Sequence, residues 1–234
     1  MQLLKLEITI QKLDLGEVNM REIISINYCL YCHKRNEIIP TWKSLLNRGF
    51  VNLTCNQCKQ KFKRVDTIVD DVFCMFDYNE EMQTYFKRLK FMKDVLLVYM
   101  FQQEIYTTLK KFHQMYPYHT ITPIPMHEEN RKSRTFAHVD EMLLAANISF
   151  SHTLKKITTD TQSKKTRMQR LETKKLFETI SDVKYKKFII FDDIKTTGVT
   201  MKLAKKALLD AGATSVILLA FSGGISKRST DVDS

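Results

Sequence analysis

The segment Phe188-Ile-Ile-Phe-Asp-Asp-Ile-Lys-Thr-Thr-Gly-Val-Thr200 contains four apolar residues, two adjacent carboxylates and a turn that leads into a helical pattern. An apolar run of this kind is typical of a strand buried on both faces of a parallel sheet. The ligand crevice of such a sheet lies at the carboxyl ends of its strands. The segment therefore predicts a strand–turn–helix unit with a site for a phosphorylated sugar. The alternative is an ordinary strand–turn–helix whose two aspartates are solvated.

The two carboxylates and the turn have the residue types that such a ligand requires. Successive strand side chains point to opposite faces, so we expect different roles for Asp192 and Asp193. One can accept hydrogen bonds from ribose hydroxyls, and the other can hold a magnesium-bound water or orient the loop amides. Residues 196–200 then surround the phosphate, because Gly198 permits close approach of the backbone and a helix N-terminus offers unpaired amides.

The rest of the chain predicts an α/β fold, in which a parallel sheet has helices on both faces. The expected elements are an extended segment at 65–78, helices at 80–90 and from Asp94 to about His113, a strand at 120–125, a helix at 136–146, a weak strand at 151–157, a strand at 188–191, a helix at 199–211 and a strand at 215–221. Gly212 is expected to stop the helix before it.

The composition is that of a soluble globular protein with an anionic partner. Apolar residues make up 44% of the 234 positions, and the net charge is +11. Residues 154–187 contain eleven Lys and Arg against four Asp and Glu; a solvated basic face is the alternative to a nucleic-acid contact there. The longest apolar run, residues 95–101, is too short to span a bilayer, and the N-terminus lacks the pattern of a signal peptide. We therefore expect a cytoplasmic protein.

Four of the five cysteines form two Cys-x-x-Cys pairs. Cys29 and Cys32 are separated from Cys55 and Cys58 by a spacer of 22 residues, slightly longer than the commonest range for zinc. A disulfide framework is the alternative, which a cytoplasmic location disfavours. Four thiolates leave no coordination position for a substrate, so the pattern predicts a structural Zn²⁺ site. The fifth, Cys74, is expected to pack as a small apolar residue.

The 188–200 segment resembles the thirteen-residue 5-phosphoribosyl-1-pyrophosphate (PRPP) motif of type I phosphoribosyltransferases, and it matches every defining position. The wider chain, roughly residues 28–221, is similar to the ComF family of late-competence proteins. The other segments that carry this similarity are both Cys-x-x-Cys pairs, Tyr78-Asn-Glu-Glu81, Ile121-Thr-Pro-Ile-Pro125, Arg134-Thr-Phe136, Gln162, Arg167 and Arg170. The motifs at the two ends are specific, and those between them are weaker.

The resemblance implies four regions: an N-terminal extension at 1–26, a zinc-binding module at 27–64, a type I phosphoribosyltransferase-like domain at 65–224, and a disordered tail at 225–234. It implies PRPP binding, with Mg²⁺, by Asp192, Asp193, Lys195, Thr196, Thr197, Gly198, Val199 and Thr200. The implied pyrophosphate and mobile-loop residues are Arg131, Arg134, Gln162, Arg167 and Arg170. The candidate nucleic-acid contacts are Lys164, Lys165, Lys174 and Lys175.

This chain differs from the sequences that it resembles at two places in the expected site. The family usually has Gly-Phe-Asn-Gln after its first arginine, whereas this chain has Arg134-Thr-Phe-Ala-His138. If the missing amides contact the ligand, either His138 substitutes for them or the affinity falls. Thr196 stands where 6-oxopurine transferases have an aspartate proposed as the general base. A threonine cannot accept a proton from a purine near neutral pH, which disfavours transfer to hypoxanthine or guanine.

Two functions are therefore expected as alternatives. In the first, which we favour, the chain is a late-competence protein that handles incoming single-stranded DNA together with a competence helicase and other DNA-uptake proteins. In the second, it is an active phosphoribosyltransferase that releases pyrophosphate from PRPP to an acceptor that the sequence does not identify. In the DNA-binding alternative, Tyr185 and Phe188 are aromatic residues near the basic stretch, and Phe188 is expected to lie in the core.

Overall fold

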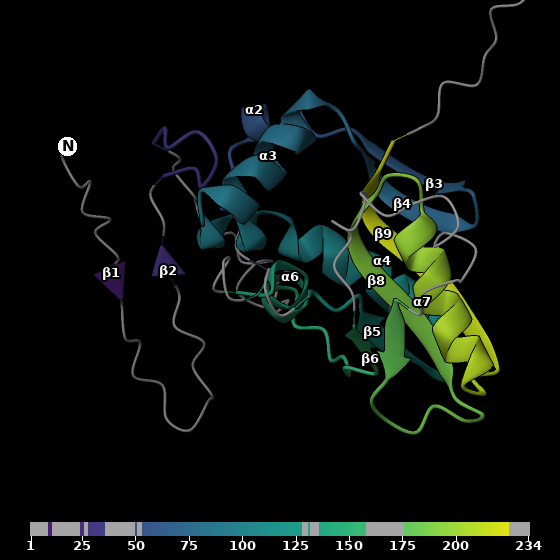
Figure 1. Cartoon of the computed structure of the whole chain (residues 1–234). Coiled ribbons are helices and arrows are strands. Elements are labelled where there is room, and N and C mark those ends of the chain that lie inside the picture. The colour runs from purple at the N-terminus through teal and green to yellow at the C-terminus, as the bar shows by residue number, and fades with distance from the viewer. Residues whose placement is uncertain are drawn as a thin grey trace, which may run out of the picture. The chain divides into compact units, whose positions relative to one another are not determined.

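The computed structural model divides the chain into two compact units, Met1–Lys61 and Phe62–Ser234 (Figure 1). The residues that it describes are 9–10, 24–25, 28–35, 50, 53–127, 131, 136–157 and 176–224. In the first unit, β1 (Thr9–Ile10) pairs antiparallel with β2 (Ile24–Ser25), and a short helix, α2, spans Asn56–Lys59. A single antiparallel bridge joins Tyr28 to Arg35 and closes the loop that carries the first cysteine pair.

The second unit is built on a five-stranded sheet. Its strands are β3 (Arg64–Val69), β4 (Val72–Asp77), β5 (His119–Pro123), β8 (Lys187–Lys195) and β9 (Ser215–Gly223), in the order β3-β4-β9-β8-β5. The predicted parallel α/β sheet is confirmed for four of these strands, and β3 is an antiparallel edge strand. The two-residue turn between β3 and β4 explains this exception, because Asp70 and Asp71 have φ values of 49° and 69°. Two successive positive φ values are typical of the turns that join neighbouring antiparallel strands.

Helices cover both faces of this sheet, as predicted. They are α3 (Glu80–Phe91), the 3₁₀ helix η1 (Val95–Phe101), α4 (Gln102–Met115), α6 (His138–Ala145) and α7 (Val199–Asp210), and a separate antiparallel pair is formed by β6 (Leu154–Lys156) and β7 (Phe177–Thr179). The N-cap Asn79 accepts a hydrogen bond from the Met82 amide at the start of α3. Gly212 follows the C-terminal end of α7. It has a φ of 98° and stops the helix, as expected.

The segment after Asp94 differs from the single α-helix that the sequence predicts. Residues 95–101 form a 3₁₀ helix, and the α-helix begins only at Gln102. The buried side chains of this segment are Leu97, Val98, Met100 and Phe101. They form two pairs spaced by three residues, and side chains three apart align in a 3₁₀ helix. The continuous apolar run therefore buries more of its side chains in this geometry than on one stripe of an α-helix.

The core lies on both faces of β8 and β9, whose side chains alternate between them. One face holds a cluster made by Cys74, Ile190, Leu218 and Ala220 with Met201, Ala204 and Leu208 of α7. On the other face, the Phe221 ring packs against the rings of Tyr85, Phe86 and Phe101 from α3 and η1. Burial of each large apolar side chain contributes roughly 1.5–3 kcal/mol. This packing fixes β8, and hence the residues at its carboxyl end, between two helical layers.

Candidate functional site

The four cysteines of the first unit form one cluster, as the sequence predicts. Their sulfur atoms all lie within 4.8 Å of one another, and Cys32 Sγ is 3.8 Å from Cys55 Sγ. Four thiolates bound at about 2.3 Å around a tetrahedral ion stand about 3.8 Å apart, so this cluster has the size that a metal ion requires. Cys29 and Cys58 are buried, while Cys32 and Cys55 are partly exposed.

Tight backbone turns aim these sulfurs at one point. In the first pair, the His33 amide donates to the Cys29 carbonyl at 2.9 Å, and His33 has a φ of 58°. In the second pair, the Cys58 amide donates to the Cys55 carbonyl at 3.1 Å, at the start of α2. Burial raises the pKa of the Cys29 thiol, but the backbone amides of Cys32 and Cys55 outweigh it and lower that pKa to about 7. A thiol of this kind is readily available as a thiolate ligand.

The motif at the end of β8 places its carboxylates and its turn next to each other. The strand continues to Lys195, so Asp192 and Asp193 lie inside its last residues and not after it. The turn that follows exposes Thr196 and Thr197 and reaches Gly198, whose φ of 74° is in the left-handed region. Gly198 is the N-cap residue of α7. The predicted strand–turn–helix unit is therefore confirmed, with a longer strand.

Asp193 is buried and accepts hydrogen bonds from three groups. Its Oδ2 atom lies 2.5 Å from His138 Nε2 and forms an ion pair with Lys90 Nζ. Its Oδ1 atom accepts the Ile194 amide at 2.7 Å. Burial raises the pKa of this carboxyl, but the Lys90 charge and the His138 hydrogen bond outweigh burial and hold the pKa well below its usual range. Asp193 is therefore an ionised carboxylate held by α3 and α6.

Asp192 is half-buried and has a different environment. Its Oδ1 atom accepts the Asp193 amide at 2.9 Å. Burial, followed by repulsion from ionised Asp193, raises the pKa of the Asp192 carboxyl well above its usual value. Two neighbouring carboxyls with opposite pKa shifts are typical of sites where each carboxyl has a separate role.

Lys195, one of the predicted ligand-binding residues, has an internal partner. Its side chain is 3% exposed, and Nζ donates to Asp70 Oδ2 at 2.9 Å. Asp70 belongs to the turn between β3 and β4. This hydrogen bond, followed by the Lys195 charge, lowers the pKa of Asp70. The ammonium thus links the motif strand to the edge hairpin of the sheet.

Sequence reasoning missed two of these partners and anticipated one. Lys90 lies in a charge-rich helical stretch far from the motif in sequence, and no local pattern distinguishes it from the solvated lysines around it. No sequence pattern indicated that Asp70 would contact Lys195 either. His138 was expected to substitute for missing amides, and the structure places it at the first residue of α6, against Asp193.

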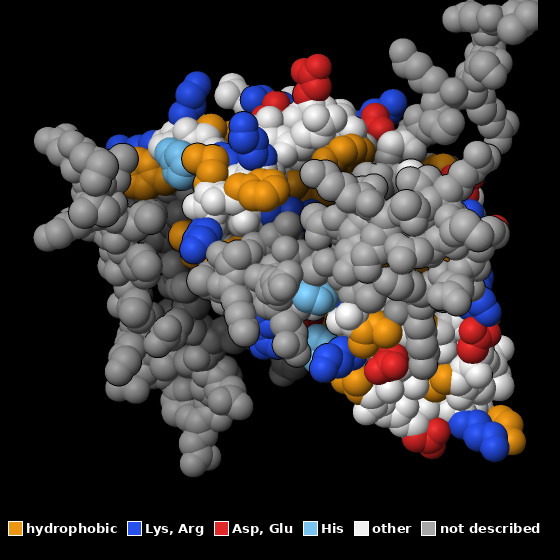
Figure 2. All heavy atoms as spheres, in the orientation of Figure 1, with side chains coloured by type: hydrophobic (Ala, Val, Ile, Leu, Met, Phe, Trp, Pro, Cys, Tyr) orange, Lys and Arg blue, Asp and Glu red, His pale blue; other side chains and the backbone are white. Residues whose placement is uncertain are grey.

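Most of the predicted loop and nucleic-acid residues lie outside the described part of the chain. These are Arg134, Gln162, Lys164, Lys165, Arg167, Arg170, Lys174 and Lys175. Arg131 is described and exposed, and its amide donates to the His127 carbonyl at 3.0 Å. On the face shown in Figure 2, the Lys and Arg side chains of the described residues are scattered among Asp and Glu. The predicted basic contacts therefore stay predictions.

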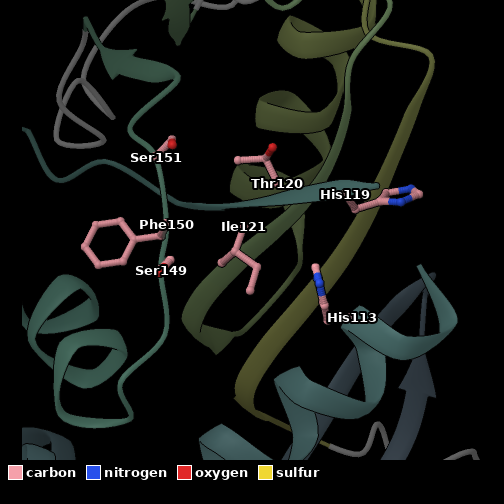
Figure 3. Close-up of a pocket in the computed structure, with 7 residues that line it drawn as sticks. All are labelled: His113, His119, Thr120, Ile121, Ser149, Phe150 and Ser151. Atoms are coloured by element: carbon pink, nitrogen blue, oxygen red, sulfur yellow. The ribbon is translucent and has the colours of Figure 1, made fainter. Parts of the chain in front are cut away.

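A separate hollow lies beside β5, toward the amino-terminal end of the strand. It measures about 170 Å³ and is lined by His113, His119, Thr120, Ile121, Ser149, Phe150 and Ser151 (Figure 3). His119 is the first residue of β5 and pairs with Lys187, the first residue of β8, whereas the aspartates lie near the carboxyl end of β8. The hollow is therefore not part of the motif site.

The opposite pKa shifts predict opposite effects of two isosteric substitutions on stability. The raised pKa of Asp192 means that the folded chain binds more protons than the unfolded chain, so its ionisation lowers stability as pH rises above the unfolded value of about 3.9. Asp192→Asn should therefore raise the free energy of unfolding at pH 7, with no gain below about pH 4. The check is urea unfolding between pH 3.5 and 8.

Asp193→Asn is the matched comparison. Because the pKa of Asp193 is lowered, its ionisation stabilises the fold above about pH 3.9, and this contribution disappears as pH falls. This variant should lose stability at pH 7 and approach the parent chain in acid. If both variants shift stability in the same direction at pH 7, the assignment of opposite electrostatic environments is wrong.

No helix among the described residues has both the length and the apolar character needed to cross a membrane.

Comparison with known structures returns matches of low sequence identity. A hypoxanthine phosphoribosyltransferase from Staphylococcus aureus is 15% identical, with a TM-score of 0.34 over 58% of this chain and 68% of that one. The allosteric regulatory enzyme of purine biosynthesis is 19% identical, with a TM-score of 0.31 over 44% of this chain and 21% of that one.

Comparison with named proteins returns two relatives that match along most of their length, although no family profile matches the chain. Competence protein ComFC of Bacillus subtilis is 24% identical over 79% of this chain and 89% of the relative. Competence protein ComFC of Streptococcus pneumoniae is 30% identical over 80% of this chain and 96% of the relative. The chain therefore belongs to the ComFC family of competence proteins.

Proposed function

We propose that this chain acts in natural competence, where it handles incoming single-stranded DNA through a domain that binds a phosphoribosyl group. Both named relatives are competence proteins. The observation that carries the ligand proposal is the pair of unlike carboxyls at the end of β8, directly before the turn that begins α7. A phosphorylated pentose offers hydroxyls to the polar side chains at this strand end and a phosphate to the turn.

The charges around the turn support an anionic ligand. The N-cap residue of α7, Gly198, has no side chain to cap the helix, and the first turn contains no acidic residue. The Val199 amide reaches the Thr197 hydroxyl only at 3.5 Å. Its first amides and positive dipole end therefore favour a phosphate. The two aspartates do not oppose this, because Lys90 balances Asp193 and the raised pKa of Asp192 favours its neutral form. Thr196 and Thr197 add exposed hydroxyls.

The proposal includes two ions and several partners. Zn²⁺ occupies the four-cysteine cluster, where a closed set of thiolates favours a structural role. Mg²⁺ accompanies PRPP at the motif. The chain works in the cytoplasm with a competence helicase and other DNA-uptake proteins.

Tyr185 is an exposed aromatic side chain that can contact single-stranded DNA. It is 75% exposed, and Lys184 Nζ lies 5.1 Å from the centre of its ring. Its backbone has a φ of 61°, and its amide donates to the Gly212 carbonyl at 2.9 Å. Exposed Lys186 and Lys187 follow it. Phe188 is buried, as expected, so only Tyr185 of these two aromatic residues can stack on a base.

PRPP binding is the first test of the ligand proposal. Titration of the full chain with PRPP and Mg²⁺ in a calorimeter should show saturable binding. Asp192→Ala should weaken that binding about tenfold or more, because it removes hydrogen bonds from a partly buried carboxyl. Asp182→Ala, which removes an exposed carboxyl before β8, is the control and should leave the affinity unchanged. Absence of PRPP binding by the parent chain would overturn the ligand proposal.

The same titrations separate binding from catalysis. Release of pyrophosphate in the presence of a nucleobase or another acceptor would support the transferase alternative. Stable PRPP binding without release, across a panel of acceptors, would support a recognition role.

Metal removal tests the zinc proposal. The purified chain should contain about one zinc per molecule by mass spectrometry of the metal. Cys29→Ser combined with Cys32→Ser should abolish zinc binding and expose residues 28–61 to proteolysis, because structural zinc contributes roughly 10–16 kcal/mol to modules of this kind. The second unit should retain its thermal transition. Cys74→Ser, which alters a cysteine outside the cluster, should retain the zinc; a zinc-free parent chain would contradict the proposal.

DNA binding is tested by fluorescence anisotropy with a labelled oligothymidine at several salt concentrations. Affinity should fall steeply with salt, as contacts to phosphates require. Tyr185→Ala should weaken binding about fivefold or more, from the loss of one stacked base. Tyr99→Ala, on the partly exposed face of η1, is the matched control and should have little effect. Equal loss in both tyrosine variants, or no binding at low salt, would contradict the assignment.

A further inference from the structure

Asp193 has little capacity left for a ligand. Its Oδ2 atom already accepts from Lys90 and His138, and its Oδ1 atom accepts the Ile194 amide. The residue is 7% exposed. A sugar hydroxyl that donated to this carboxylate would have to displace a cation or compete with two strong donors. The fold has therefore used one of the two motif carboxylates internally.

His138, in contrast to Asp193, has a polar atom without a partner. It is 5% exposed, and its Nε2 atom is engaged by Asp193. An ionised carboxylate only accepts, so Nε2 is the donor in this contact. The other ring nitrogen, Nδ1, is buried and has no hydrogen-bond partner among the described residues. A sugar hydroxyl can both donate and accept a hydrogen bond, so it is a suitable partner for this nitrogen.

The unpaired nitrogen costs free energy in the ligand-free protein. A buried polar atom without a partner costs about 1–3 kcal/mol, and such atoms are rare in folded proteins. A ligand hydroxyl that hydrogen-bonded to Nδ1 would remove that cost. The site would then prefer ligands that carry this hydroxyl, because an analogue without it would leave the nitrogen unpaired.

The surroundings of His138 keep the ring in place. It lies in the first turn of α6, and its partner Asp193 is fixed in β8. Lys90 comes from α3, and its ammonium also lies 4.7 Å from the centre of the Phe86 ring. Three elements thus fix one imidazole orientation. The half-buried Asp192 is the neighbouring carboxyl, and only its Oδ1 atom accepts a described hydrogen bond, from the Asp193 amide.

We infer that His138 is a specificity-determining residue, whose Nδ1 atom forms a hydrogen bond with a ring hydroxyl of a 5-phosphorylated pentose. Asp193, held by Lys90, is a positioning residue that orients the imidazole and does not contact the sugar. The second sugar hydroxyl is left to Asp192. This inference rests on the proposed phosphoribosyl site and adds which side chains distinguish the sugar from a bare phosphate.

The test compares four probes by calorimetry with the full-length chain: ribose 5-phosphate, 2-deoxyribose 5-phosphate, xylose 5-phosphate and inorganic phosphate. The two altered sugars remove the 2-hydroxyl or invert the 3-hydroxyl. The parent chain should prefer ribose 5-phosphate over at least one of them by about tenfold or more. His138→Ala should reduce that preference to about threefold or less, while the affinity for inorganic phosphate stays within about twofold.

Two further variants separate a specific role from a general loss of structure. His138→Gln keeps one donor for Asp193 and one acceptor for the sugar, so it should restore most of the preference. Asp193→Ala should lose the preference to the same extent as His138→Ala, and the double variant should lose no more, since both act through one imidazole. Thermal unfolding of each variant shows whether it is folded; if Asp193→Ala is not, the comparison of Ala and Gln at position 138 decides.

The outcomes keep the two proposals apart. If the parent chain binds ribose 5-phosphate no better than inorganic phosphate, the phosphoribosyl site itself is overturned. If the parent chain selects ribose 5-phosphate and folded His138→Ala selects it equally well, the role of His138 is overturned and the phosphoribosyl site stands. The inference is supported if His138→Ala loses the preference for ribose 5-phosphate over the altered sugars and His138→Gln recovers it.

Discussion

A buried carboxylate at the end of the central strand constrains the second unit. Asp193 cannot remain ionised in the interior without compensating charge, and the fold supplies Lys90 from α3 and His138 from α6. Removal of one partner from a buried ion pair typically costs about 3–5 kcal/mol, because the remaining charge loses its compensation. The ion pair therefore fixes two helices to β8 at the point where the turn to α7 begins. Phe221 and its aromatic neighbours fix the same layer from the core.

The parts of the fold that sequence could predict are those set by local chemistry. An apolar run followed by a glycine-containing turn gives β8 and α7, and the spacing within each Cys-x-x-Cys pair gives the metal-sized cluster. Both depend on residues a few positions apart. The 3₁₀ helix at 95–101 was not predicted, because its geometry follows from which of seven consecutive large side chains reach the core. That depends on the tertiary packing of the finished fold.

The site shows the same limit at the level of single atoms. Sequence identified Asp192, Asp193 and Lys195 as residues of one site, and the structure places all three at the end of β8. It could not show that Lys195 pairs with Asp70, or that Asp193 is satisfied by a lysine from a distant helix. A motif lists the residue types that a site contains. Which of their polar atoms remain open for a ligand depends on partners that come from elsewhere in the chain.

The open atoms are therefore a better guide to function than the motif alone. At the end of β8 the fold has satisfied the ionised carboxylate and left a less acidic carboxyl and one imidazole nitrogen. Both unfavourable features, the raised pKa and the unpaired Nδ1, lie within one rigid strand end and one helix turn. Such features reduce the stability of the empty protein, and a ligand that relieves them binds the folded chain in proportion to that relief. A ligand with hydroxyls beside a phosphate would relieve both features at the end of β8, and the free energy that it recovers would strengthen its binding.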